Sequence, residues 1–340
     1  MTKKNIVFIE LLRIIACFLV IVNHTNSSIF LSIKPSLTWF ISLTYFFCCK
    51  IAVPIFIIIY GYLQLHKNVD YKKTFKSIIK IILVILIFSL LYYLHYKPTD
   101  MSVVNYLKTI YSSNITNAYW YLYAYLGILM MTPFLQKMIK NFEKKDFYIY
   151  FAISAIFFMI FPIIGHYIPA LTYNSSFQLP LCNIYIFFLL VGAYLKRYSI
   201  NFKHIKLYCI LTFIGCISLN VALTYLEYLK VNGNGYLFYD NFIFLPVVLA
   251  SISIFVLFSK INIKRSNKLS KIITFFGSLT FGIYLLSDYN IEKFRFINTF
   301  LLSKGLHPLL SMLLFEICVF LIGGLMTFIL KKMPFIKKLI

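Results

Sequence analysis

Residues 5–26 read NIVFIELLRIIACFLVIVNHTN, a nearly unbroken apolar run of the length that crosses a lipid bilayer. Three ionisable residues interrupt it, namely Glu10, Arg13 and His24. On a helix, the step from Arg13 to His24 makes three full turns plus roughly 20°, and Glu10 lies about one turn before Arg13. The polar stripe joins two depths about 16 Å apart, at about 1.5 Å per residue. Because ionisable groups are costly inside hydrocarbon, this stripe predicts a functional site.

The rest of the chain is equally apolar, with 61% hydrophobic and 13% charged residues among 340. An ordinary soluble domain has about half apolar and about a quarter charged residues, so that class is excluded. The formal net charge of +23 could indicate a nucleic-acid partner, but the basic residues flank apolar runs instead of gathering on a polar domain. We therefore expect membrane lipids, and no nucleic acid, as partners.

The cysteines predict neither a disulfide framework nor a metal site. There are seven, mostly inside apolar runs, and none form a C-x-x-C pair. The first apolar run has full membrane length, and no small-residue cleavage pattern follows it. We therefore expect it to stay in the membrane and not to be removed as a signal peptide.

Runs of about 17 to 25 mainly apolar residues indicate the membrane spans. They lie near 6–25, 40–64, 78–96, 118–136, 147–165, 181–196, 207–226, 241–259, 272–289 and 306–330. Because only helices and closed barrels satisfy the backbone in lipid, the fold class is an all-α integral membrane protein, a polytopic bundle of about ten transmembrane helices. The loops between spans are short, so residues 1–340 are expected to form one membrane domain without a soluble extracytoplasmic domain.

Basic residues predict the topology. They gather in alternate connections, beginning with Lys3 and Lys4 and continuing at 67–80, 137–145, 196–206, 260–271 (with Lys264 and Arg265) and 331–338. The connections on the other side hold far fewer. By the positive-inside rule, both termini are cytoplasmic and His24 lies near the outer face.

Four stretches resemble the motifs of one family, the acyltransferase-3 family of membrane acyltransferases. Glu10 and Arg13, with His24 after a ten-residue gap, are similar to its first-helix signature. The other three are AVPIFIIIYGY (52–62), which resembles V-P-x-F and S-G-[YF]; WYLYAYLG (120–127) with Thr132-Pro133, which resembles W-Y-L and T-P-x-L; and SLTFGIYL (278–285), which resembles S-x-G-I-Y-L. The motifs occur in the family's order.

The chain departs from the family pattern at three places. Tyr60 replaces the usual serine, and Leu286-Ser287-Asp288 stands where many members have a histidine. An arginine pair common after the second helix is represented by lysines, at 72, 73, 76 and 80. Lysine keeps the positive charge but lacks the planar bidentate fork of arginine.

The resemblance implies a bacterial cell-membrane enzyme that transfers an acyl group, commonly acetyl from cytoplasmic acetyl-CoA, to a hydroxyl of a surface polysaccharide or its lipid-linked precursor. Acetyl-CoA would be a cosubstrate, with no tightly bound cofactor. His24 suits the catalytic role of acid/base or acyl-carrying nucleophile. Arg13 could hold a CoA phosphate or polarise the thioester carbonyl, and Glu10 could orient Arg13.

The same resemblance implies roles for further residues. Lys73 and Lys76 would attract the polyanionic donor. Trp120 and Tyr121 could stack on the acceptor sugar, and Asp288 lies near the outer end of its span, where it could bind the acceptor or orient His24. Each role has a structural alternative: an interfacial histidine, a structural Glu10–Arg13 ion pair, lysines that only determine topology, and an interfacial aromatic belt.

Two other function classes fit a multispan bundle. A glycan transporter or flippase also needs a cavity with aromatic and basic lining, but such proteins tend to have more spans and internal pseudosymmetry, of which the sequence has no sign. A glycan polymerase would need larger extracytoplasmic loops than those predicted here. Consumption of acetyl-CoA distinguishes an acyltransferase from both.

Overall fold

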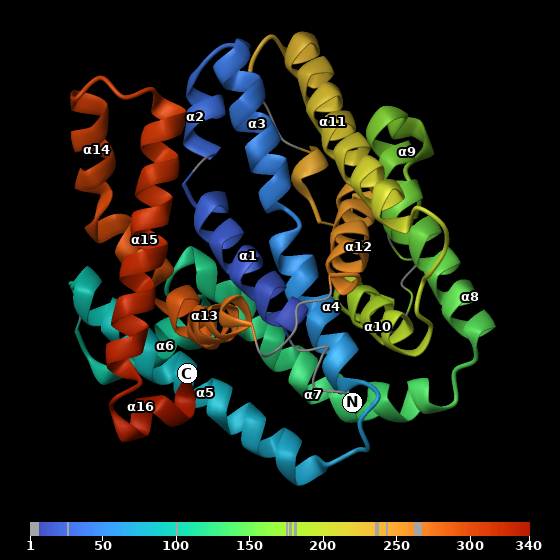
Figure 1. The fold of residues 1–340 in the computed structure, drawn as a ribbon, viewed down its shortest axis with the longest axis horizontal. Helices are drawn as coiled ribbons and strands as arrows, with labels where there is room; N and C mark the ends of the chain where they lie inside the picture. The colour runs from blue at the N-terminus through green and yellow to red at the C-terminus, as the bar shows by residue number, and fades with distance from the viewer. Residues whose placement is uncertain are drawn as a thin grey trace. The chain divides into compact units, whose positions relative to one another are not determined.

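The structure, a computed structural model, describes residues 7–25, 27–99, 101–174, 176, 179, 182–234, 238–242, 244–261 and 267–340. Within these ranges the elements are helical and no strand occurs, so the predicted all-α class is confirmed (Figure 1). Lys3, Lys4, Lys264 and Arg265, which the topology prediction counts, lie outside the described residues.

The helices belong to two compact units, which are described separately. Unit 1 comprises Met1–Lys67 and Met138–Gly277, and unit 2 comprises Asn68–Lys137 and Ser278–Ile340. The helices of unit 1 are α1 (Val7–Asn23), α2 (Ser27–Ser32), α3 (Leu37–Cys49), α4 (Ala52–Gln64), α8 (Lys144–Ala155), α9 (Phe161–Tyr167), α10 (Ile184–Arg197), α11 (Ile205–Val231) and α12 (Leu245–Ser259). Those of unit 2 are α5 (Tyr71–Tyr96), α6 (Val103–Ser112), α14 (Arg295–Ser303), α15 (Pro308–Leu330) and α16 (Pro334–Leu339). Residues of α7 (Trp120–Lys140) and α13 (Lys268–Lys293) fall in both units. A single membrane domain over 1–340 stays a prediction.

Seven helices of the described part are long and apolar enough to cross a membrane, so the chain is a multi-pass membrane protein. They are Leu37–Gln64, Tyr71–Tyr96, Asn117–Lys140, Lys144–Tyr167, Ile205–Val231, Lys268–Lys293 and Pro308–Leu330. The other three predicted spans form α1, α10 and α12, which have 17, 14 and 15 residues. The count of ten spans and the cytoplasmic side of the termini stay predictions.

Two glycines let α4 and α10 cross closely in unit 1. A Cβ on Gly61 would lie 2.1 Å from the carbonyl oxygen of Leu189, and a Cβ on Gly192 would lie 2.2 Å from that of Ile58. Neither distance leaves room for a side chain, so both positions require glycine. Gly61 belongs to the second motif found in the sequence, and this contact gives it a packing role.

The second predicted span is interrupted at Lys50 and Ile51, between α3 and α4. Pro54 lies in the first turn of α4, where its missing N–H and its ring would disrupt a continuous helix at Lys50. The Nζ atom of Lys50 lies 3.5 Å from Oδ2 of Asp240 and 3.9 Å from the centroid of the Phe46 ring. The cation inside this span is therefore compensated by an anion and an aromatic face.

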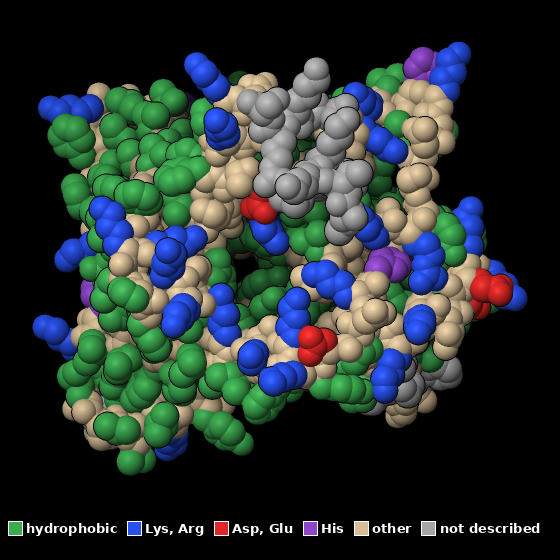
Figure 2. Space-filling view, turned by 60° about the horizontal axis from the view of Figure 1, so that its bottom comes forward, with side chains coloured by type: hydrophobic (Ala, Val, Ile, Leu, Met, Phe, Trp, Pro, Cys, Tyr) green, Lys and Arg blue, Asp and Glu red, His purple; other side chains and the backbone are tan. Residues whose placement is uncertain are grey.

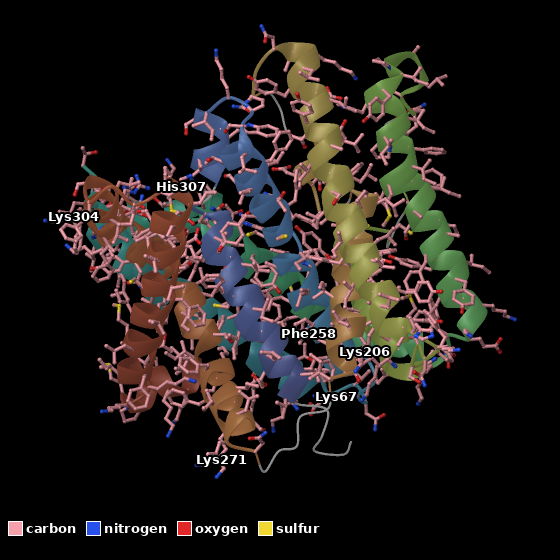
Figure 3. All side chains as sticks on the ribbon, turned by 45° about the horizontal axis from the view of Figure 1, so that its top comes forward. Lys67, Lys206, Phe258, Lys271, Lys304 and His307 are labelled. Carbon is pink, nitrogen blue, oxygen red and sulfur yellow. The ribbon has the colours of Figure 1, made fainter. Side chains whose placement is uncertain are left out.

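Polar residues mark both ends of unit 1. Lys67, Lys206 and Lys271 lie toward the same end of the unit as Phe258 (Figure 3). At the other end, Asn234 accepts a hydrogen bond from Nε1 of Trp39 at 3.2 Å. Its Nδ2 atom lies 3.1 to 3.2 Å from the carbonyl oxygens of Phe30, Leu31 and Ile33. Asn234 thus ties the end of α2 and the residue after it to the end of α11.

Unit 2 has an antiparallel core. The Lys137 ammonium, near the end of α7, lies 5.5 Å from the ring of Tyr71 at the start of α5. At the opposite end of α5, the hydroxyls of Tyr92 and Tyr119 both donate to the carbonyl oxygen of Leu285 in α13, at 3.1 and 2.9 Å. One carbonyl group of α13 therefore anchors both α5 and the residue directly before α7.

Basic side chains far outnumber acidic ones on the face drawn in Figure 2. Such a surplus is typical of the cytoplasmic ends of membrane helices.

Candidate active site

The polar stripe begins with an ion pair on α1. Because Glu10 and Arg13 are three residues apart on one helix, their side chains are neighbours. Nη1 of Arg13 donates to Oε1 of Glu10 at 2.8 Å, and the side chains are 35% and 12% exposed, respectively. The apolar residues around them, including Ile9 and Leu12, are buried. The pairing offsets the cost of both charges in apolar surroundings.

Arg13 has donors to spare. A guanidinium group carries five N–H donors, and the contact with Glu10 uses one of its nitrogens. No other described residue pairs with the Arg13 side chain. Because a third of that side chain is exposed, the remaining donors could bind a phosphate or a carbonyl oxygen.

Gly277, near the middle of α13, lies against the Glu10 carboxylate. A Cβ on this glycine would lie 2.4 Å from Oε2 and 2.8 Å from Cβ of Glu10. Only a hydrogen atom fits in that space, so Gly277 limits the positions open to the carboxylate. Nothing in the sequence identified this neighbour, because it is far from Glu10 along the chain and comes directly before the fourth motif.

His24 follows the last residue of α1. Its backbone N–H donates to the carbonyl oxygens of Val20 and Ile21, at 3.3 and 3.1 Å, which extends the helical hydrogen bonding by one residue. The next residue, Thr25, donates its hydroxyl to the carbonyl oxygen of Ile21 at 3.1 Å and thereby closes the helix end. The His24 side chain is half-buried. The structure therefore brings Glu10 and Arg13 into contact and keeps His24 about 16 Å further along the same helix, at about 1.5 Å per residue.

A basic and aromatic cluster near the end of α4 was not predicted as part of the site. The Lys196 ammonium lies 4.8 Å from the ring centroid of Tyr62, and Nε2 of His66 lies 2.7 Å from the carbonyl oxygen of Ala193. Partial burial, together with the positive charges of Arg197 and Lys196, lowers the pKa of His66. Tyr62 also packs edge-on against Phe8 of α1, with ring centroids 6.0 Å apart, so this cluster adjoins the turn that carries Glu10.

The two lysines predicted to attract the donor lie in the first turns of α5, in unit 2. Lys73 and Lys76 are exposed. The carboxylate of Asp70 caps this helix by accepting from the backbone N–H of Lys73 at 2.9 Å. Tyr92 is nineteen residues further on, roughly 28 Å along the axis at about 1.5 Å per residue. Within unit 2, Lys73 and Lys76 are therefore far from Tyr92 and Tyr119 at the other end of α5.

Trp120, Tyr121 and Asp288 lie together in unit 2. Trp120 and Tyr121 are half-buried with ring centroids 5.9 Å apart, and Tyr121 packs edge-on against Tyr284 at 6.2 Å. Oδ2 of Asp288 accepts a hydrogen bond from the backbone N–H of Ala118 at 2.9 Å. The Tyr284 hydroxyl donates to the carbonyl oxygen of Ala118. Asp288 thus has a structural role at the start of α7 that the sequence did not reveal. Its proposed contact with the acceptor stays a prediction.

Metal ligands do not cluster in the described residues: no group of three or more His, Cys, Asp or Glu side chains there could hold an ion. Ionic binding at Arg13 and proton transfer at His24 stay predictions.

Comparison with known proteins identifies the family. A family model described as an acyltransferase domain, acyltransferase 3, matches residues 6–331, nearly the whole chain. No curated protein and no solved structure matches it. The matched range includes the α1 stripe and all four motifs found in the sequence. The chain therefore belongs to the acyltransferase-3 family, and it is a membrane transferase of acyl groups.

Proposed function

We propose that the protein is an O-acetyltransferase of the bacterial cell membrane. It moves acetyl from cytoplasmic acetyl-CoA to a hydroxyl of a cell-surface polysaccharide or of its lipid-linked precursor. The observation that carries this proposal is the α1 stripe, with Arg13 paired to Glu10 and His24 eleven residues further along the same helix. Membership of the family supplies the acyl-transfer chemistry.

The proposed reaction divides between the two ends of the stripe. At the Arg13 end, the remaining guanidinium donors bind a phosphate of the donor, which leaves the pantetheine arm to carry the thioester toward His24. At the His24 end, the imidazole removes the proton of the acceptor hydroxyl. The C–S bond of the thioester breaks, a C–O bond to the glycan forms, and the proton passes to the released CoA thiolate. An acyl-histidine intermediate would divide the same transfer into two steps.

Lys73, Lys76, Trp120, Tyr121 and Asp288 complete the proposal. The exposed lysines near the start of α5 raise the local concentration of the polyanionic donor. The aromatic pair Trp120 and Tyr121 offers a face for a sugar ring, and the Asp288 carboxylate would accept a hydrogen bond from a sugar hydroxyl.

The test is turnover of radiolabelled acetyl-CoA by the purified protein in nanodiscs, with the host's surface-glycan fraction as acceptor. Wild type should release CoA and label the glycan, and His24→Ala, shown to be folded by its thermal melt, should do neither. Equal labelling by His24→Ala would remove His24 from the site. If wild type releases no CoA but moves labelled glycan lipid across vesicle membranes, the transporter interpretation replaces this one.

A further inference from the structure

Unit 1 contains an open apolar groove, of about 690 Å³, between α9, α11 and the start of α12. We call it the α9–α11 groove. Leu219, Leu223 and Leu226 line it from α11, opposite Ile163 of α9 and beside Leu245 of α12. The α11 residues are spaced by four and three, so they share one helix face. Leu219 and Leu226 are 47% and 53% exposed, although they lie within a membrane-spanning helix.

Both long walls of the groove belong to the two least buried candidate spans among the described residues. Each span contains an 18-residue apolar window, and the buried share of that window is 17% in Lys144–Tyr167 and 22% in Ile205–Val231. The corresponding share is between 39% and 61% in the other five candidate spans. Because exposed leucines at this depth contact lipid chains, the groove is open to the bilayer.

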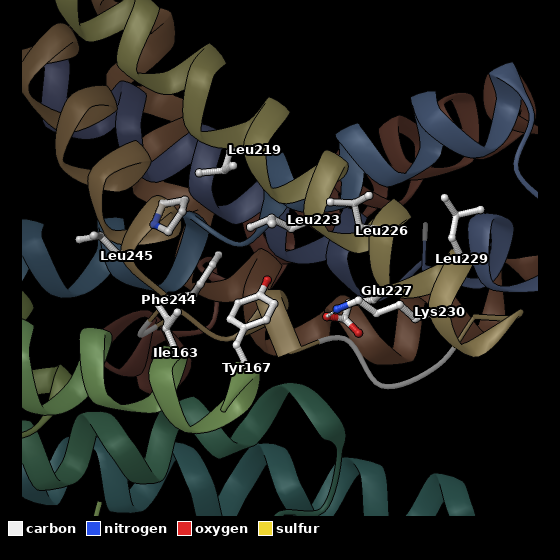
Figure 4. A pocket seen from close by; sticks show the side chains of 11 residues that line it. Ile163, Tyr167, Leu219, Leu223, Leu226, Glu227, Leu229, Lys230, Phe244 and Leu245 are labelled. Atoms are coloured by element: carbon white, nitrogen blue, oxygen red, sulfur yellow. Dashed lines mark ion pairs between the residues drawn. The ribbon is translucent and has the colours of Figure 1, made fainter. Parts of the chain in front are cut away.

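A polar cluster closes one end of the groove (Figure 4). We call His166, Tyr167, Glu227, Lys230 and Tyr239 the Glu227 cluster. Oε1 of Glu227 accepts from the Tyr239 hydroxyl at 3.0 Å and lies 3.3 Å from Nε2 of His166 and 3.6 Å from Nζ of Lys230. The Tyr167 and Tyr239 hydroxyls are hydrogen-bonded at 2.5 Å, and the Lys230 ammonium lies 5.4 Å from the Tyr167 ring centroid.

The cluster has unused hydrogen-bonding capacity toward the groove. All three contacts of Glu227 involve Oε1, and no described residue donates to Oε2. Tyr239 is 1% exposed, and burial raises the pKa of its phenol, which stays protonated and donates to Glu227. Tyr167 and Lys230, by contrast, are exposed at the end of the groove that they line.

Charge balance indicates what the cluster can bind. The negative charge of Glu227 is offset by Lys230, so the cluster does not attract a strongly charged head group. Its free carboxylate oxygen accepts a donor, while the Lys230 ammonium and the Tyr167 hydroxyl can bind oxygen lone pairs. Neighbouring hydroxyls of a sugar present both kinds of group, and the exposed Tyr167 ring offers a face to its C–H groups.

We propose that the α9–α11 groove binds the apolar chain of a lipid-linked glycan in which no phosphate separates the lipid from the first sugar, with that sugar held at the Glu227 cluster. Leu219 lies eight residues before Glu227, so the chain would extend roughly 12 Å into the membrane along α11, at about 1.5 Å per residue. This proposal rests on the proposed function in that its ligand is the acceptor of the acyl group. It selects the lipid-linked precursor, not the finished polysaccharide, as that acceptor.

The test is photolabelling of the full-length protein in phosphatidylcholine nanodiscs. The probe is an undecyl glucoside with a diazirine in its chain, and the comparison probe is the matching diazirine alcohol without the sugar. The glucoside should label peptides from α9 and α11, and excess unlabelled undecyl glucoside should compete. Leu223→Trp, which fills the groove, should abolish this labelling, whereas Leu211→Trp, on an exposed part of α11 outside the groove, should not. Glu227→Gln should require about tenfold more competitor, because it removes a charged hydrogen-bond acceptor.

The outcomes separate the groove from the enzyme activity. Equal labelling by the sugar-free alcohol, without competition by the glucoside, would mean that ordinary lipid chains fill the groove and would overturn the proposal. An equal effect of Leu211→Trp and Leu223→Trp would overturn it as well. If the wild type acetylates glycans but shows no competed labelling, the groove proposal fails alone. Competed labelling without any acetyl transfer would uphold the groove and reject the proposed function.

Discussion

Gly277 faces the carboxylate of Glu10 so closely that a Cβ at residue 277 would lie 2.4 Å from Oε2. The Gly277→Ala variant should therefore displace the carboxylate and disturb its ion pair with Arg13. A shift of about 1 Å at a catalytic group can lower a rate about a hundredfold, so we expect acetyl transfer to fall by about ten- to a hundredfold. Initial rates of CoA release measure the effect.

Gly215→Ala is the matched control for this variant. Gly215 also lies inside a long helix, α11, but a Cβ there meets no atom within 4 Å. The Gly215→Ala protein should be as active as the wild type. Full activity of Gly277→Ala would mean that the position of the Glu10 carboxylate does not matter for the reaction.

Arg13 should not be replaceable by lysine. Arg13→Lys keeps one charge for Glu10 but loses the additional guanidinium donors, so activity should fall about tenfold or more. Arg13→Ala should cost about a hundredfold to a thousandfold, as the loss of one preorganised charge-stabilising donor does. The rates of both variants, at saturating and at low acetyl-CoA, separate weaker donor binding from slower chemistry.

The double variant Glu10→Gln/Arg13→Ala tests the pairing itself. If Glu10 acts by orienting Arg13, the double variant should be no slower than Arg13→Ala alone. Lys145→Ala, at an exposed lysine that pairs with Glu143, is the control and should be fully active. An additive loss in the double variant would contradict the orienting role of Glu10.

The crossing of α4 and α10 should tolerate no side chain at Gly61. In Gly61→Ala the new methyl group meets the backbone of Leu189 at 2.1 Å, and backbone atoms cannot move aside as a flexible side chain can. Overpacking of this kind costs about 1 to 3 kcal/mol. For a large protein this should lower the Tm in detergent by several degrees, at about 2 to 4 °C per kcal/mol.

Gly127→Ala serves as the comparison for Gly61→Ala. Gly127 lies inside α7, and a Cβ there meets nothing within 4 Å, so alanine should leave the Tm unchanged or raise it slightly through its higher helix propensity. If the Gly61→Ala protein has the same Tm as the wild type, α4 and α10 can move apart without loss of stability.

The pH dependence of stability should include a contribution from His66. Partial burial and the nearby charges of Arg197 and Lys196 lower its pKa from the usual value near 6.5. The folded protein therefore holds this imidazole neutral at a pH where the unfolded chain would bind a proton. Its contribution to stability is complete above about pH 6.5 and is lost as the pH falls through that value toward the lower folded-state pKa.

Melting curves between pH 7.5 and 5 check the His66 prediction. His66→Gln can still donate to the carbonyl oxygen of Ala193 but does not titrate, so its Tm should fall less with acidification than that of wild type. His204→Gln, at the N-cap of α11 and without such a bond in the described residues, should behave as wild type. The same acid sensitivity in all three proteins would exclude His66 as a source.

Local features of this protein could be predicted from its sequence, and contacts between distant segments could not. The adjacency of Glu10 and Arg13 follows from a three-residue spacing on a helix, and the break before Pro54 follows from proline chemistry. The closeness of Gly277 to Glu10, the crossing at Gly61 and the Asn234 contacts with the chain after α2 depend on how helices pack. Helix periodicity does not encode that information, because many pairings bury the same apolar surface in lipid.

The bounds of α12 show the same limit. Hydropathy placed a span at 241–259, but it did not predict that the helix there would have only the 15 residues Leu245–Ser259. Helix ends depend on local contacts, such as the Thr25 hydroxyl on Ile21, that a window of average hydropathy does not register.

The stripe on α1 sets the distance that the acyl group must travel. His24 comes eleven residues after Arg13, which is roughly 16 Å at about 1.5 Å per residue, whereas a hydrocarbon core is about 30 Å thick. The two ends of the stripe therefore cover about half of the membrane barrier. In the predicted orientation, the donor and the acceptor hydroxyl would each have to reach inward past the head groups to cover the rest.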